Sequence, residues 1–236
     1  MKESRRFSII EAMRYPAPPP QSESELLLHC EQLAGCTLAQ LATEAKISLP
    51  DSLHTDKGWI GQFIEQLLGA TASSLPEPDF QKIGVELKTL PVNSTGQPQE
   101  TTYVCTVPLS DNHGMQWETS WVRRKLQRVL WLPIEATPNI ALAERRIGMP
   151  LLWSPTEAEN LQLKQDWEEL MELVVTGQLE QVSARNGTWL QIRPKAANAR
   201  VLCSTYDADG CPAETLPRGF YLRTIFTRSL VQQYYI

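Results

Sequence analysis

Residues 83–92, with the sequence IGVELKTLPV, are the segment that most restricts the fold of this chain. Apolar and polar residues alternate along it, which is typical of a β-strand with one buried face. Residues two apart on a strand share a face, so Glu86 and Lys88 are expected to point the same way. The segments 100–109 and 128–135 are also rich in β-branched and aromatic residues. Together these segments predict a sheet at the centre of the molecule.

Helical periodicity flanks the predicted strands on both sides. Apolar residues recur every three or four positions in 22–35, 37–47 and 56–70, and again in the long acidic segment 155–177. Two shorter strands, TWLQIRP and GFYLR, are expected on either side of a polar loop at 194–215. The order of the elements predicts an α/β fold with a central mixed sheet flanked by helices.

Composition limits the class of protein. The 236 residues suffice for a core without disulfides, and the prolines in 1–21 predict a flexible extension before a single domain at 22–236. The cysteines form no CxxC pair, and no apolar run approaches the roughly 20 residues of a membrane span. A cytoplasmic protein with reduced thiols is therefore expected. The net charge of −5 argues against non-specific coating of nucleic acid but permits an enzyme with one basic cleft.

The motifs of several enzyme classes are absent from the sequence. It contains no Walker A motif, no GxGxxG and no GxSxG, so ATPase, dinucleotide-binding and serine-hydrolase functions have no support. The histidines and cysteines lack the spacing of zinc ligands, which argues against a structural zinc site.

Asp79 and the strand that follows it carry the candidate chemistry. Asp79 precedes the strand, and Glu86 and Lys88 share one of its faces. Two converging carboxylates offer the hard oxygen ligands that Mg²⁺ prefers, and the backbone carbonyl of Leu87 would add a third ligand. A metal ion there would polarise a phosphate and activate a water molecule. Lys88 would orient that water or offset the charge that develops on the phosphate.

A solvated surface is the alternative interpretation, because an Asp, a Glu and a Lys on an exposed strand face usually do no chemistry. Glu65 favours the chemical interpretation, since it lies in an otherwise apolar helical segment. A carboxylate in such a place is costly unless it is paired or binds metal. Glu77 and Glu100 flank the same region. Glu65 would also fit an ordinary helix residue that faces water.

The densest positive charge in the sequence lies just before the predicted strand 128–135. It consists of Arg123, Arg124, Lys125 and Arg128. A solvated helix face is one interpretation. A phosphate-facing role is favoured, because positive charge near the carboxylates would offset their repulsion of DNA.

Pro78-Asp79 and Glu86-x-Lys88 resemble the PD-(D/E)xK signature that many restriction endonucleases share. That signature is short, and longer motifs in the chain are more specific. From about residue 22 to about residue 230 the chain resembles the MutH family through the following motifs, in this order: DKGWIG (56–61), GVELKT (84–89), ETTYVC (100–105), RKLQRVLW (124–131), PLLWSP (150–155), DWEELM (166–171), LQIRPKAANA (190–199) and LPRGFYL (216–222).

The resemblance implies roles for individual residues. Asp79, Glu86 and Lys88 match the catalytic acid, acid and lysine of the family. Glu65 matches a further active-site carboxylate near the metal. Lys57 and Lys125 match lysines of the family that act in DNA binding or catalysis. Arg193 and Tyr221 match the residues that read the GATC site and sense adenine methylation, and Lys195 lies in the same recognition loop. Tyr103 lies close to the DNA, where the family commonly has Phe.

The resemblance also implies an activity. MutH enzymes are Mg²⁺-dependent endonucleases with a restriction-endonuclease-like fold, in which two arms surround a DNA-binding cleft. They nick the unmethylated strand at hemimethylated GATC sites in methyl-directed mismatch repair. The partners expected from the resemblance are double-stranded DNA with GATC sites, MutL as the activator and, indirectly, MutS. The chain is expected to be a monomer.

Two other functions stay open on the sequence. A Sau3AI-like restriction endonuclease also recognises GATC but cuts both strands, although such enzymes tend to carry a second related domain. A DNA-binding module without catalysis would require the loss of one acid or of the lysine, and all of them are present.

Overall fold

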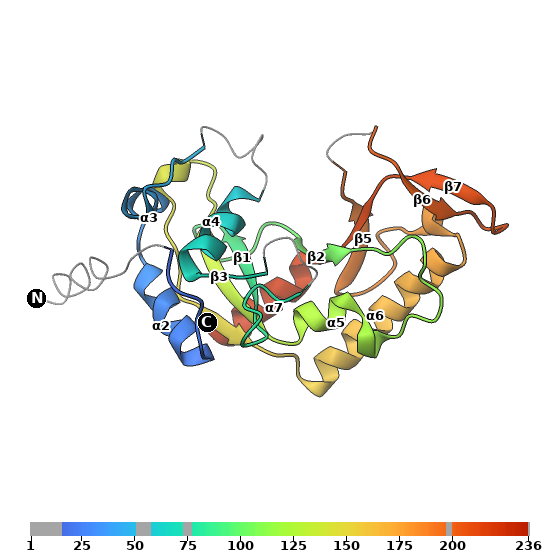
Figure 1. Ribbon diagram of the computed structural model, residues 1–236, viewed down its shortest axis with the longest axis horizontal. Helices are drawn as coiled ribbons and strands as arrows, with labels where there is room; N and C mark the ends of the chain where they lie inside the picture. The colour runs from blue at the N-terminus through green and yellow to red at the C-terminus, as the bar shows by residue number, and fades with distance from the viewer. Residues whose placement is uncertain (1–15, 51–57, 73–76, 197–199, 236) are drawn as a thin grey trace, which may run out of the picture. The chain divides into compact units, whose positions relative to one another are not determined.

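The computed structural model describes residues 16–50, 58–72, 77–196 and 200–235, which belong to two compact units (Figure 1). Unit 1 comprises the described chain up to Gln99 together with Arg128–Trp153, and unit 2 comprises Glu100–Gln127 and the chain from Ser154 onward. Each unit therefore combines segments that lie far apart in the sequence.

Unit 1 is built around a mixed sheet. Its strands are β1 (Glu86–Val92), β3 (Val129–Glu135) and β4 (Leu151–Trp153), in the order β1-β3-β4. β1 runs parallel to β3 with Glu86 opposite Val129, whereas β4 is antiparallel to β3. The predicted α/β fold with a mixed sheet is confirmed, and the strand with the candidate chemistry lies at an edge of that sheet.

Helices precede the sheet in unit 1, as the periodicity predicts. They are α2 (Glu23–Leu33), α3 (Leu38–Ala45) and α4 (Trp59–Leu68). The hydroxyl of Ser22 accepts a hydrogen bond at the start of α2, and Thr37 forms a capping box with Gln40 at the start of α3. These caps satisfy backbone N–H groups that a helix leaves unpaired, so the local sequence sets where each helix begins.

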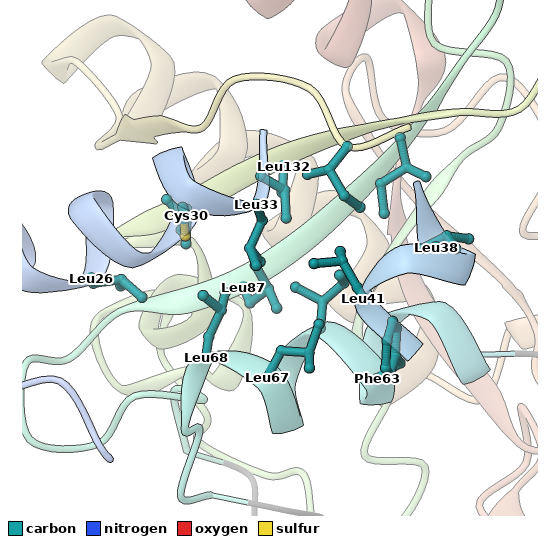
Figure 2. Packing of buried hydrophobic residues seen from close by; sticks show 14 of the residues in the cluster. Leu26, Cys30, Leu33, Leu38, Leu41, Phe63, Leu67, Leu68, Leu87 and Leu132 are labelled. Atoms are coloured by element: carbon teal, nitrogen blue, oxygen red, sulfur yellow. The ribbon is translucent and has the colours of Figure 1, made fainter. Parts of the chain in front are cut away.

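The core of unit 1 lies between these helices and one face of the mixed sheet (Figure 2). Leu130, Leu132 and Ile134 are two apart on β3 and so share this face, and Leu87 on β1 lies opposite Leu130. The helices contribute a set of fully buried apolar residues: Leu26, Cys30, Leu33, Leu38, Leu41, Ile64, Leu67 and Leu68. Because Leu87 packs into this core and lies between Glu86 and Lys88, the core also holds the part of β1 that carries these two side chains.

The end of the predicted N-terminal extension packs against α4. Ala17 is buried, and its N–H donates to the Leu67 carbonyl at 3.1 Å. Gly69 has a φ of 74°, and a Cβ atom there would lie 2.5 Å from the Ala17 carbonyl oxygen. Only glycine tolerates both the left-handed backbone and this close approach. Residues near Ala17 thus belong to the packed part of unit 1, while 1–15 lie outside the described residues.

Unit 2 contains a separate antiparallel sheet, so the expectation that the strand predicted at 100–109 joins 83–92 and 128–135 in one central sheet is wrong. Its strands are β2 (Thr102–Thr106), β8 (Arg218–Leu222) and β5 (Leu190–Pro194), in the order β2-β8-β5. Leu190, Ile192, Phe220 and Leu222 alternate along β5 and β8 and are buried. The intervening residues are more exposed, apart from a glycine, so one face of the sheet is covered and the other carries polar and aromatic groups.

Two long helices belong to unit 2 together with this sheet. α6 (Glu157–Val175) packs beside β5, and α7 (Thr224–Tyr235) places the Phe226 ring 5.3 Å from the Trp189 ring. The remaining helices of the described chain are short: η1 (Trp117–Thr119), α5 (Trp121–Leu126), η2 (Leu142–Glu144) and η3 (Leu179–Gln181). No helix in the described ranges combines the length and the apolar character needed to cross a membrane.

The predicted polar loop at 194–215 is partly wrong, because it contains a hairpin. β6 (Cys203–Tyr206) pairs with β7 (Pro212–Thr215), and Asp207 organises the turn by accepting from the N–H groups of Asp209 and Cys211. The hairpin escapes the sequence pattern because most of its side chains are polar or exposed on both faces.

The core predicts a large effect for one substitution on α4. Leu67→Ala should reduce the free energy of unfolding by about 2–5 kcal/mol, since it leaves a cavity in a fully buried place. Leu28→Ala on α2 is the matched control, because Leu28 is 54% exposed, and its effect should stay within about 0.5 kcal/mol. Urea unfolding followed by circular dichroism measures both. Equal effects of the two variants would contradict the assignment of the core.

Candidate functional site

A tight turn brings Asp79 beside the start of β1. The Phe80 N–H donates to the Val85 carbonyl at 2.9 Å, and the Val85 N–H donates back to the Phe80 carbonyl at 3.3 Å. Gly84 lies within this reversal with a φ of 65°, a conformation that glycine adopts without strain. Asp79 therefore lies alongside the strand, although it precedes it in the sequence.

Asp79 hydrogen-bonds to the outer edge of β1. Its Oδ2 accepts from the backbone N–H of Leu87 at 2.8 Å. The Glu86 N–H donates instead to the Arg128 carbonyl at 2.9 Å, on the side of β3. Successive residues of a strand present their backbone groups to opposite edges. The Leu87 carbonyl and the Asp79 carboxylate therefore lie on the same edge of the sheet.

Glu86 and Lys88 share a face, as the alternation predicts. Lys88 Nζ lies 2.5 Å from Glu86 Oε1. Glu86 is only 1% exposed and Asp79 only 7%, so neither is the solvated surface carboxylate of the alternative interpretation. A buried carboxylate requires a partner, and Lys88 and the Leu87 N–H supply one to each acid.

Glu65 lies on α4, where its side chain is partly exposed, on a helix whose other face buries Phe63, Ile64, Leu67 and Leu68. The structure does not gather it with Asp79 and Glu86 into a three-acid cluster. Within the four described ranges, no set of three or more histidine, cysteine, aspartate or glutamate side chains is grouped to hold a metal ion. The oxygen donors near β1 are thus those of Asp79, Glu86 and the Leu87 carbonyl, and the role of Glu65 stays a prediction.

The predicted basic cluster divides between the two units, and Arg128 falls in unit 1. Nε and Nη2 of Arg128 donate to the two carboxylate oxygens of Glu23 at 2.7 and 2.6 Å. Hydrogen bonding to Arg128 lowers the pKa of Glu23, and the same bond raises the pKa of Arg128. In this structure the guanidinium of Arg128 ties α2 to the start of β3, and a phosphate-facing role for Arg128 stays a prediction.

The other basic residues of the cluster lie on α5 in unit 2. Ser120 caps this helix by accepting from the Arg123 N–H at 3.1 Å. The Arg124 guanidinium lies 4.8 Å from the centre of the Trp121 ring. Lys125 is 9% exposed, so the interpretation of a solvated helix face does not hold for it. An ammonium so deeply buried is costly unless it is compensated, which marks Lys125 as more than a surface charge.

The other described DNA-binding candidates gather on one face of the sheet in unit 2. Tyr103 on β2 lies directly opposite Tyr221 on β8, and Arg193 on β5 lies opposite Gly219. Opposed residues share a face of an antiparallel pair, and so do residues two apart on one strand. Lys195, two residues after Arg193, accordingly continues the same row. We call these four side chains, Tyr103, Tyr221, Arg193 and Lys195, the recognition face.

Cations and rings contact one another on the recognition face. The rings of Tyr103 and Tyr221 meet edge to face, with centroids 5.4 Å apart. Lys195 Nζ lies 3.5 Å from the centre of the Tyr103 ring, and the Arg193 guanidinium lies 5.8 Å from the centre of the Tyr221 ring. Arg193 also donates to the Thr101 hydroxyl at 3.0 Å. Each cation is thus oriented before any ligand is present.

Gly219 makes room for this arrangement. A Cβ atom at that position would lie 2.9 Å from Cε2 of Tyr103 and 3.1 Å from Cε2 of Tyr221. Both distances are shorter than ordinary carbon contacts, so any side chain would displace the two rings. Gly219 and Thr101 were not among the residues predicted from the sequence. Alternation offered a signal for Gly219, since it lies two residues before Tyr221 on one strand.

The surroundings of Tyr221 shift its acidity. Burial is the main cause that raises the pKa of its hydroxyl, the neighbouring Tyr103 raises it further, and the charge of Arg193 works in the opposite direction. Tyr221 is therefore neutral at physiological pH and keeps its hydroxyl proton as a hydrogen-bond donor. Lys57, which the resemblance also links to DNA, lies outside the described residues.

The fold and the family match together define the class of this protein. A mixed sheet flanked by helices, with two buried acids and a lysine around one strand, is the restriction-endonuclease-like type of α/β fold. The family model described as DNA mismatch repair enzyme MutH matches residues 68–166. The chain belongs to the MutH family, because relatives of that name match nearly its whole length.

Three of these relatives illustrate the extent of the similarity. The DNA mismatch repair protein MutH of Vibrio vulnificus strain YJ016 is 55% identical over 215 residues, which cover 91% of this chain and 95% of the relative. The protein of the same name from Escherichia coli O6:K15:H31 strain 536 is 54% identical over 227 residues, 95% of this chain and 99% of the relative. That of Salmonella paratyphi B is 56% identical over 218 residues, 92% and 94% of the two chains.

The contacts of Tyr221 predict how its titration responds to a charge. Arg193→Ala removes the positive charge that opposes the rise, so the pKa of Tyr221 should rise further. A folded-state pKa above the unfolded value near 10.0 means that the stability from this group is complete below that pH and is lost above it, and the total loss is larger in Arg193→Ala. The ultraviolet absorbance of tyrosinate measures the shift, with Tyr221→Phe identifying the residue. A lower pKa in Arg193→Ala would contradict the contact.

Proposed function

We propose that this chain is a Mg²⁺-dependent endonuclease that nicks the unmethylated strand of hemimethylated GATC sites in methyl-directed mismatch repair. The observation that carries the proposal is the pairing of two buried acids with a lysine at the edge of β1: Asp79 bonded to the Leu87 N–H, and Glu86 bonded to Lys88. Membership in a family of DNA mismatch repair enzymes supports the same conclusion.

The donor set at β1 fits a magnesium ion. Mg²⁺ takes oxygen ligands, usually one or two carboxylates completed by waters and phosphate oxygens. Asp79, Glu86 and the Leu87 carbonyl are hard oxygen donors within one short segment, and the set contains no sulfur or imidazole that would favour zinc. When bound, Mg²⁺ would polarise the scissile phosphate and lower the pKa of the attacking water. We include Glu65 as a further carboxylate ligand of the same metal site.

Lys88 has two tasks in this mechanism. In the described structure its ammonium forms an ion pair with the buried carboxylate of Glu86. If the carboxylate of Glu86 bound a metal ion instead, the ammonium of Lys88 would be free to orient the attacking water. It would also offset the negative charge that develops on the phosphate. The carboxylates hold the metal, and Lys88 acts on the reacting groups.

The recognition face supplies chemistry suited to reading bases. The Arg193 guanidinium can donate two parallel hydrogen bonds to the O6 and N7 atoms of guanine in the major groove. The neutral Tyr221 hydroxyl would contact the adenine amino group, where an added methyl would remove or distort the contact. Lys195 and Tyr103 would flank this pair, while Lys125 and Lys57 would bind phosphates and fix the register without reading sequence.

The partners follow from the proposed pathway. Duplex DNA with GATC sites would be the substrate, MutL the activator and MutS the indirect signal of a mismatch, in the cytoplasm. Activation requires that MutL bind one state of this chain better than another. We propose that MutL favours the state in which the two arms are closed around the DNA. We also propose that the chain acts as a monomer.

Removing one acid should separate cleavage from binding. Asp79→Asn keeps the size of the side chain but weakens the metal ligand, so the rate of nicking should fall at least about 100-fold. The affinity for a GATC duplex without divalent cations should change less than about threefold, because the phosphate contacts come from basic residues elsewhere. Glu77→Gln, in the same segment, is the control with normal nicking. A denaturing gel and fluorescence anisotropy provide the two readouts, and unaltered nicking in Asp79→Asn would refute the site.

The methylation state of the DNA tests the specificity. With Mg²⁺ and MutL, a hemimethylated GATC duplex should be nicked in its unmethylated strand only, and a fully methylated duplex should resist. Tyr221→Phe should reduce this discrimination by about 5- to 150-fold, as expected for the loss of a contact of ~1–3 kcal/mol. Strand-specific end labels distinguish the products. Breaks in both strands of every duplex, independent of MutL, would favour a Sau3AI-like restriction endonuclease instead.

A further inference from the structure

Asp166 on α6 is a buried carboxylate outside the candidate active site. It is 2% exposed, and its oxygens accept four hydrogen bonds. Three of them come from consecutive backbone N–H groups: Thr188 at 2.9 Å, Trp189 at 2.6 Å and Leu190 at 2.8 Å. Gln162, one turn earlier on α6, supplies the fourth at 2.9 Å. A carboxylate that collects successive backbone donors in this way fixes the segment that carries them.

The segment held by Asp166 is the start of β5, one of the two edge strands of the sheet β2-β8-β5 in unit 2. The Arg223 N–H donates to the Trp189 carbonyl at 2.7 Å, and the Lys195 N–H donates to the Pro217 carbonyl at 2.7 Å, so alternate residues of β5 bond to the chain of β8. Leu190 lies between such residues, and its N–H points to the open edge. Asp166 accepts it there, so this carboxylate covers the exposed beginning of the strand.

Further contacts hold the loop that leads into β5. On α6, the carboxylate of Glu169 accepts from the Asn186 side chain at 2.9 Å and from the Gly187 N–H at 3.1 Å. Arg223, which follows the last residue of β8, donates to the carbonyls of Ala184 at 3.1 Å and Asn186 at 2.8 Å. The loop 183–189 thus donates hydrogen bonds to α6, and its carbonyls accept hydrogen bonds from Arg223 at the end of β8.

Gly187 allows the loop to approach so closely. Its φ is 70°, and a Cβ atom there would lie 2.1 Å from the Leu190 carbonyl oxygen and 3.6 Å from Cβ of Asp166. A side chain at this position would collide with the backbone of β5 itself. Steric contacts at Gly187 therefore restrict the conformation of the loop, in addition to its hydrogen bonds.

We propose that Asp166 is a positioning residue for the recognition face, because it sets the register of β5 against β8. In that register Arg193 lies opposite Gly219 and its guanidinium reaches the Tyr221 ring. A slip of β5 by one residue would turn Arg193 to the opposite, buried face of the sheet, and a slip by two would move it about 6.6 Å along the strand. The inference rests on the proposed reading of GATC by Arg193 and Tyr221.

Asp166→Asn tests the proposal with little change in shape. An asparagine keeps one acceptor oxygen but turns its NH₂ group toward backbone N–H groups, so at least one of the bonds to residues 188–190 is lost. Binding of the full chain to two fluorescent duplexes, one with GATC and one with a single base of that site changed, is measured by anisotropy without divalent cations. We expect the preference for GATC to fall at least about tenfold while the weak affinity for the altered duplex is retained.

A matched control lies on the same helix. Glu168 is two residues from Asp166 but exposed, with its carboxylate 3.7 Å from Lys164, and Glu168→Gln should keep the full preference. Thermal unfolding of each variant ensures that binding is measured on folded protein. A purely structural role would lower the melting temperature of Asp166→Asn but leave the preference of the folded molecules unchanged, and that result would overturn the proposal.

A second variant keeps the test decisive if Asp166→Asn does not fold. Glu169→Gln weakens the hold on Asn186 and Gly187 at an exposed place, and it should reduce the preference by about two- to fivefold. An unchanged preference would then count against the proposal. Equal binding of both duplexes by the wild-type chain would instead refute the proposed function. Hydrogen exchange at residues 188–190 would then test the role of Asp166, because faster exchange in Asp166→Asn is expected if Asp166 holds β5, and unchanged exchange would overturn the proposal.

Discussion

The hydrogen bond from the Leu87 N–H to Asp79 is the contact on which the candidate active site depends. It attaches a residue from before the turn to the edge of β1, and it lies one residue from Glu86, whose carboxylate is neutralised by Lys88. Beneath it, Leu87 packs into the core between the helices and the sheet (Figure 2). The apolar core and the acids are therefore fixed by the same short strand. A substitution that disturbs the packing of Leu87 would also move Asp79 and Glu86.

The recognition face is organised by a different kind of interaction. Its rings and cations lie on strands, where alternation alone fixes the face on which each side chain points. Their positions along the strands come from hydrogen bonds made by residues that lie away from the face, above all Asp166. A polar carboxylate buried in unit 2 thus has a role in geometry rather than in stability alone, since a buried charge adds little net stability even when it is well paired.

Much of this could be predicted from the sequence where the causes are local. Alternation in 83–92 predicted the shared face of Glu86 and Lys88, and helical periodicity predicted the helices α2 and α3. The sequence did not reveal contacts between distant segments, such as the pair of Arg128 with Glu23. It also did not reveal the hairpin β6–β7, whose strands lack one apolar face. Long-range pairs depend on the tertiary fold, which no short window of sequence encodes.

The interleaving of the two units has a consequence for engineering. Residues 128–153, which supply β3 and β4 to unit 1, are inserted within the chain of unit 2. Neither unit is a continuous stretch of polypeptide, so truncation at either terminus damages one unit without isolating the other. A chimera that combines unit 1 of this chain with unit 2 of a relative requires three splice junctions, after Gln99, Gln127 and Trp153. Such exchanges transplant a unit whole, whereas a single crossover would divide it.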